Sequence, residues 1–149
     1  ISACLVGSEM CIRDRHTTDD RTPVTFITRY YLDKIKRLCD AHGTKLLFVT
    51  APSPVNHTMQ RHNEVQALAD ALAVPYLDLN LNTEELGIDW NLDTLDGGDH
   101  LNYTGCQKAT AYLQWYMQTH YTLPDRRDDV RYEAWNKQAE EFEKLLPQP

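Results

Sequence analysis

Apolar residues recur every three or four positions in four stretches of the chain, which is the spacing of one face of an α-helix. The first stretch begins at a Thr-Pro pair (residues 22–23), an N-cap followed by proline at the first helical position, and ends at Gly43. The others cover residues 59–72, a segment from about Tyr103, and residues 132–146. The apolar positions are Ile27, Tyr31, Ile35 and Leu38, then Val65, Leu68, Ala69 and Leu72, then Cys106, Ala109, Leu113, Tyr116 and Met117, and finally Trp135, Ala139, Phe142 and Leu146. We expect the last set to face inward.

Two short apolar runs separate the first three helices and predict β-strands. Residues 45–50 (KLLFVT) are mostly apolar, which is typical of a central strand in a parallel sheet, and residues 74–79 (VPYLDL) form the second run. Pro52 and Pro54 end the first strand because neither can donate a hydrogen bond to a sheet. Alternating helices and strands predict an α/β fold with a short parallel sheet. Residues 80–99 then form a long polar connection, which compact domains seldom keep without a purpose.

Composition narrows the class of protein. The chain has 149 residues, enough for one domain, and a net charge of −7, which argues against nonspecific nucleic-acid binding. No apolar run is long enough to span a bilayer, so we expect no membrane contact from this segment. The four cysteines form no CxxC pair, which argues against a zinc knuckle or a thioredoxin-type site. Cys39 and Cys106 lie in helical patterns, where we expect them to be small buried hydrophobic residues.

The first fifteen residues (ISACLVGSEMCIRDR) have no basic stretch before an apolar core, so they are not a signal peptide. Residues 10–14 can be back-translated to a DNA sequence that resembles the end of a common transposase sequencing adapter. We therefore interpret residues 1–15 as adapter-derived, with a genuine disordered arm as the alternative. A sheet of two or three strands leaves an edge open, so we interpret residues 16–149 as the C-terminal portion of a domain whose earlier strands are missing.

The strongest candidate for chemistry is the sequence DGGDHLN at residues 96–102. Its glycines allow a tight turn that presents the imidazole of His100. A nearby carboxylate can accept the imidazole N–H, set the tautomer and stabilise the imidazolium form, as in a Ser-His-Asp arrangement. The alternative is a surface turn rich in aspartate and glycine, with His100 as a capping group.

The stretch DGGDHLNYTG, followed by a helix that contains lysine, resembles the C-terminal block of the SGNH/GDSL hydrolase superfamily, and more narrowly of bacterial SGNH-type acyl-transfer proteins. KLLFVTAPSP, RHNEVQALADALAVPYLDLN and LPDRRDD add support, so that the resemblance covers about residues 25–136. It implies a flavodoxin-like three-layer α/β/α sandwich and a serine esterase or O-acyltransferase. The substrate would be an ester, for example of cell-envelope carbohydrate, and the location extracytoplasmic or in the envelope. We expect no cofactor and no metal.

The resemblance also implies roles for individual residues. In the superfamily a histidine near the C-terminus is the general base, and an aspartate three residues before it orients the ring. His100 matches the base, but the position three before it is Gly97, which leaves Asp96 and Asp99 as candidates. We prefer Asp96, because two glycines can absorb the extra residue and because Asp99 would point away from its neighbour in an extended backbone.

A nucleophile is harder to find. The chain has no Gly-Asp-Ser and no G-x-S-x-G sequence, and Gly7-Ser8 lies in the doubtful first segment. Ser53 follows a predicted strand, but we expect its hydroxyl to satisfy amides of a turn. The chain is therefore predicted to carry the histidine-bearing part of an enzyme without its serine.

Other interpretations stay open. His57, His62 and His100 are the residue type of a three-histidine metal site, although we expect solvated or capping roles for the first two. The whole chain is alternatively a noncatalytic SGNH-like module that binds polysaccharide or scaffolds a complex. A truncated fragment with no function of its own is the third reading.

Overall fold

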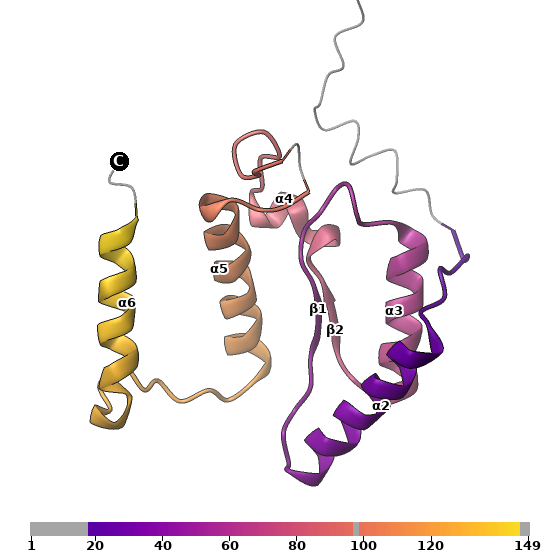
Figure 1. Cartoon of the computed structure of the whole chain (residues 1–149), viewed down its shortest axis with the longest axis horizontal. Helices are drawn as coiled ribbons and strands as arrows, with labels where there is room; N and C mark the ends of the chain where they lie inside the picture. The colour runs from indigo at the N-terminus through magenta and orange to yellow at the C-terminus, as the bar shows by residue number, and fades with distance from the viewer. Residues whose placement is uncertain (1–17, 97–98, 147–149) are drawn as a thin grey trace, which may run out of the picture. The chain divides into compact units, whose positions relative to one another are not determined.

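The structure is a computed structural model that describes residues 18–96 and 99–146, so the interpretation of residues 1–15 lies outside the described residues. It is a mixed α/β protein, which confirms the predicted class (Figure 1). In chain order the elements are α2 (Phe26–Ala41), β1 (Phe48–Thr50), α3 (Met59–Leu72), β2 (Tyr76–Asp78), the 3-10 helix η1 (Leu79–Asn82), α4 (Thr83–Leu86), α5 (Tyr103–His120), the 3-10 helix η2 (Val130–Tyr132) and α6 (Glu133–Leu145). The chain divides into two compact units between Tyr112 and Leu113.

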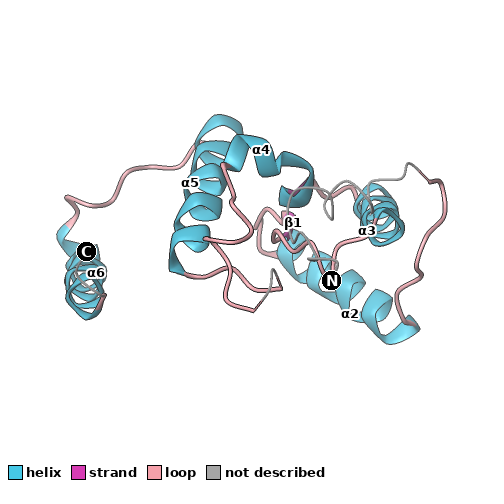
Figure 2. Cartoon of the chain, turned by 90° about the horizontal axis from the view of Figure 1, so that it is seen from above, coloured by secondary structure: helices cyan, strands magenta, loops and turns pink. Residues whose placement is uncertain are grey.

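The sheet consists of β1 and β2, which pair in parallel as predicted, with Val49 opposite Leu77. Both strands are shorter than the apolar runs, and Figure 2 shows that strands make up little of the chain. Pro75 has no N–H to give to the ladder, but its carbonyl accepts from Phe48 N at 2.9 Å and so sets the register. The carboxyl ends of both strands lie at the same edge of the sheet, where Thr50 faces Asp78.

Helix α3 spans residues 59–72, the range that the sequence predicts. Thr58 caps it by accepting a hydrogen bond from Arg61 N at 3.3 Å, and the left-handed backbone of Ala73 (φ 51°) ends it. Leu68 and Ala69 are buried as the apolar pattern predicts. Glu64 is buried as well, which the pattern does not predict.

Glu64 ties α2 to α3 within the first unit. Its Oε1 accepts a hydrogen bond from Val24 N at 3.3 Å and forms an ion pair with Arg29. Helix α2 begins at Phe26, with Thr25 as its N-cap, slightly later than the predicted Thr-Pro start. Thr25, and not Thr22, is the N-cap because its Oγ1 accepts a hydrogen bond from the backbone N–H of Thr28.

The apolar stripes of the two amphipathic helices are exposed. In α2 the stripe residues Tyr31 and Leu38 are 59% and 61% exposed. In α6 Trp135 and Phe142 are 73% and 54% exposed, so the prediction that they face inward is wrong. The described residues of the second unit form the end of α5, η2 and α6, which is too little chain to enclose a core.

The expectation that both cysteines are buried is wrong. Cys106 is exposed and Cys39 only half-buried, because the helix faces that carry them are not covered. The polar connection expected after β2 contains η1 and α4, and a bridge between Thr94 and Leu101 closes it. No helix in the described part of the chain is long and apolar enough to cross a bilayer.

Gly105, in the first turn of α5, lies against the backbone of Asp93, so that a Cβ there would clash with the Asp93 carbonyl oxygen and approach Leu101 Cδ2 at 3.1 Å. Gly105→Ala should gain up to about 1 kcal/mol of helix propensity and lose more to this clash. We expect the free energy of unfolding to fall by about 1–3 kcal/mol, measured by chemical denaturation. Thr110→Ala, at an exposed position of the same helix, is the control; an equal or higher stability of Gly105→Ala would contradict the close approach.

Candidate active site

Asp93 anchors the loop that leads to His100. Its carboxylate is buried and accepts hydrogen bonds from Asp89 N (2.7 Å), Thr104 Oγ1 (2.9 Å) and Lys108 Nζ (2.5 Å). Burial alone would raise the pKa of Asp93, but these hydrogen bonds, with Lys108 foremost, outweigh burial and lower it. The loop is thereby fastened to α5 by a carboxylate that stays charged.

An antiparallel bridge between Thr94 and Leu101 folds the loop back on itself. Leu95 N donates to His100 O at 2.9 Å across this hairpin. Asp96 and His100 therefore face each other although four positions separate them in the chain. The hairpin, and not a helix or strand, sets the geometry of this pair.

Asp96 contacts His100 through both of its carboxylate oxygens. Oδ2 lies 2.6 Å from His100 Nδ1, and Oδ1 accepts from His100 N at 2.8 Å. This hydrogen bond is the main reason that the pKa of His100 is raised, and the negative charges of Asp96 and Asp99 add to it. The same bond lowers the pKa of Asp96. The neutral ring accordingly carries its proton on Nδ1, and Nε2 is left as the acceptor.

Asp99 also lies beside the ring, with Oδ2 3.6 Å from His100 Nδ1. The expectation that Asp99 points away is wrong, because residues 99–100 form a bend instead of an extended strand. The Asp99 carboxylate accepts from Asn56 Nδ2 and, at 3.4 Å, from Ser53 Oγ. Of the two predicted carboxylates, Asp96 is the one in direct hydrogen-bond contact with the imidazole, and Asp99 is its charged neighbour.

The imidazole is accessible. The side chain of His100 is 69% exposed, and within residues 18–96 and 99–146 no group hydrogen-bonds to Nε2. An Nδ1-anchored histidine with an open Nε2 can accept a proton from a hydroxyl that approaches from solvent.

Ser53 lies in the turn after β1 and close to this cluster. Its Oγ accepts a hydrogen bond from Asn56 N at 3.1 Å, which confirms the expected turn role. The contact with the site is made through Asp99 rather than through the imidazole. Ser53 therefore supports the cluster from the side of the sheet.

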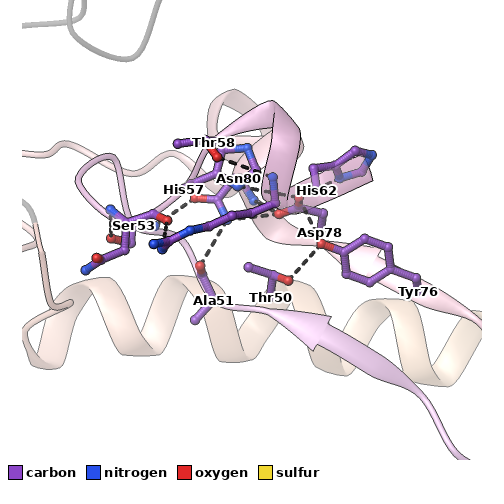
Figure 3. Close-up of polar contacts among 11 residues, drawn as sticks. Thr50, Ala51, Ser53, His57, Thr58, His62, Tyr76, Asp78 and Asn80 are labelled. Carbon is purple, nitrogen blue, oxygen red and sulfur yellow. Dashed lines mark hydrogen bonds and ion pairs between the residues drawn. The ribbon is translucent and has the colours of Figure 1, made fainter. Parts of the chain in front are cut away.

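His57 and His62 belong to a different cluster, built around Asp78 at the end of β2 (Figure 3). Asp78 Oδ2 lies 2.7 Å from His62 Nδ1 and 3.6 Å from His57 Nδ1. The two histidine side chains are only 15% and 12% exposed, so the expected solvated roles are wrong. The two histidines lie beside Asp78 because a buried, negatively charged carboxylate needs polar partners.

Asp78 is itself a residue that sequence reasoning underrates. Burial alone would raise its pKa, but hydrogen bonds from Asn80 and His62 outweigh burial and lower it. Tyr76 shares the cluster: its hydroxyl donates to Asp78 Oδ2 at 3.1 Å, and burial raises the pKa of Tyr76. The available signal was the set of polar residues Asp78, Asn80 and Asn82, at and just after the end of an apolar strand, where α/β proteins gather their sites.

Asp96, Asp99 and His100 have ligand atoms within 4.8 Å of one another, which is close enough for a cation. In the structure Nδ1 is engaged with Asp96 by a hydrogen bond. Hydrogen bonding and ion pairing among the three residues account for their positions.

No family model matches the chain, and neither does any curated protein or any solved structure. The predicted superfamily membership stays a prediction.

Asp96→Asn should lower the pKa of His100 towards its ordinary value, because the substitution removes the charge and weakens the acceptor at Nδ1. The raised pKa means that the contact favours the folded state below the ordinary imidazole pKa and that this contribution is lost as pH rises through the raised pKa. NMR titration of the ring proton on Cε1 measures the change. Asp40→Asn, an exposed carboxylate of α2, is the control; an unshifted His100 in Asp96→Asn would contradict the contact.

Proposed function

We propose that this chain is the histidine-bearing part of a serine esterase or O-acyltransferase of the SGNH/GDSL type. His100 acts as general base, and Asp96 orients it. The observation that carries the proposal is the contact of 2.6 Å between Asp96 Oδ2 and His100 Nδ1 on a ring that is otherwise exposed. Asp99 adds a second negative charge next to the same nitrogen.

This geometry supports acyl transfer because it prepares Nε2 to move a proton in both directions. In the first half-reaction Nε2 takes the proton of a serine hydroxyl while the serine oxygen attacks the ester carbonyl carbon. The imidazolium, stabilised by Asp96, then gives that proton to the leaving alkoxide as the ester bond breaks. In the second half-reaction Nε2 accepts a proton from water or an acceptor hydroxyl that attacks the acyl-serine, and returns it to the serine.

The proposal places the nucleophilic serine outside the described residues. Ser53 is engaged with Asn56 N and Asp99, and within the described residues no hydrogen bond joins it to the imidazole of His100. We further propose that additional strands extend the two-stranded sheet to a flavodoxin-like sandwich and bring the serine to the edge that holds His100. The exposed stripe of α2 supports this extension, since parallel sheets are normally covered on both faces.

The substrate class we propose is an ester with an exposed acyl group, such as an O-acetylated envelope carbohydrate. The exposure of His100 supports access by a bulky substrate, because no described side chain covers the ring. An extracytoplasmic location belongs to the same proposal.

The test is ester hydrolysis by the complete protein encoded at the native locus. His100→Ala should lower kcat for p-nitrophenyl acetate by roughly 10²- to 10⁴-fold, because a positioned general base contributes that much. His42→Ala, which changes an exposed histidine at the end of α2, should leave the rate unchanged. Turnover that survives His100→Ala would contradict the enzymatic role, and a complete protein that binds polysaccharide without hydrolysis would favour the noncatalytic module.

Ester hydrolysis by the 149-residue chain alone is a second, independent test. We expect its rate of p-nitrophenyl acetate hydrolysis to be no higher than that of its own His100→Ala variant, because the proposed nucleophile is absent from the described residues. The measurement is the initial rate of p-nitrophenolate release. A rate well above that of the variant, abolished by Ser53→Ala, would show that Ser53 is the nucleophile.

A further inference from the structure

We propose that Asn80 is a positioning residue for His100: its side-chain amide fastens the turn after β1 to the end of β2, and that turn holds Asp99 beside the imidazole. The proposal rests on the role of His100 proposed above, but it concerns residues that do not touch a substrate. It connects the buried cluster around Asp78 with the exposed cluster around His100.

The first step is the burial and hydrogen bonding of Asn80. Only 6% of the residue is exposed, and it lies in η1 directly after β2. Its Oδ1 accepts from Ser53 N at 2.7 Å, and its Nδ2 donates to Ala51 O at 3.0 Å (Figure 3). Both groups of the amide therefore bind the backbone of the same turn, on either side of Pro52.

Asn80 is itself held in place by Asp78. Asp78 Oδ1 accepts from Asn80 N at 3.0 Å and from Asn80 Nδ2 at 2.9 Å. The other oxygen of Asp78 is held by His62 at 2.7 Å. The amide of Asn80 consequently has one orientation, because a flipped amide would place its carbonyl oxygen against the carboxylate.

The third step leads from the turn to the imidazole. Asp99 accepts from Ser53 Oγ at 3.4 Å and from Asn56 Nδ2, so the turn holds this carboxylate from one side. Its other oxygen lies 3.6 Å from His100 Nδ1. Asp99 lies in the loop that carries His100. Its contacts with Ser53 and Asn56 join it to the turn after β1. A turn released from Asn80 would no longer hold Asp99 at this distance.

The experiment compares the titration of His100 by NMR in isotopically labelled 149-residue chains. Asn80→Ala should lower the pKa of His100 in the same direction as Asp99→Asn, because both changes remove the Asp99 charge from the ring. The double variant Asn80→Ala/Asp99→Asn should titrate as Asp99→Asn does, since Asn80 acts through Asp99. Asn82→Ala is the matched control: it removes the same side chain from the same 3-10 helix, where Nδ2 reaches only Glu85 at 3.4 Å.

Three results would overturn the proposal. The pKa of His100 could stay unchanged in Asn80→Ala while Asp99→Asn lowers it, the two effects could add in the double variant, or Asp99→Asn could have no effect. Circular dichroism shows whether Asn80→Ala still folds. Should it not fold, the exposed Asn56→Ala replaces it, with a lowered pKa expected and an unchanged pKa counting against the turn.

This test is separate from the test of the proposed function. The titration needs no substrate and no nucleophile. Should Asn80→Ala shift His100 as expected while turnover of the complete protein survives His100→Ala, the enzymatic role fails and the positioning of the histidine stands.

Discussion

Asp78 carries a negative charge at the end of a strand, nearly sealed from water, and the polar residues at the carboxyl edge of the sheet are arranged around it. A carboxylate in that place is costly unless each oxygen has partners, and losing a partner of a buried charge typically costs about 3–5 kcal/mol. His62 and Tyr76 form hydrogen bonds with Oδ2 of Asp78, and Asn80 donates a hydrogen bond to Oδ1. These partners come from α3, β2 and η1, so satisfying one charge fixes three elements at one edge of the sheet.

The apolar contribution to this unit is small by comparison. The buried apolar residues include Leu68 and Ala69 of α3 and Leu77 of β2, whereas the apolar stripe of α2 is exposed. Two strands offer little surface for a second helix to cover, and a two-stranded sheet is marginal by itself. Specific polar contacts, such as the ion pair of Arg29 with buried Glu64, therefore place α2 where apolar packing does not.

The sequence predicts features that depend on neighbours along the chain. The range of α3 follows from the spacing of its apolar residues, and the Asp96–His100 pair closes within one hairpin. The parallel pairing of the strands follows from the alternation of helix and strand. What the sequence does not predict are contacts between distant segments: the burial of His57 and His62 against Asp78 depends on how α3 meets β2. The prediction that the apolar face of α6 points inward is wrong for the same reason, since periodicity shows which residues share a face but not what covers that face.

The two carboxylates beside His100 illustrate this difference within one site. Asp96 reaches the imidazole through the hairpin that contains both residues, so its contact is local and survives wherever that hairpin forms. Asp99 is adjacent to His100 in sequence, yet its position depends on Ser53 and Asn56, more than forty residues earlier. Proximity in sequence is therefore a poor guide to which carboxylate is rigidly placed. Asp99 is held by the turn after β1, and that turn is held by Asn80. Because Asn80 is hydrogen-bonded to Asp78, the position of Asp99 depends on the Asp78 carboxylate as well.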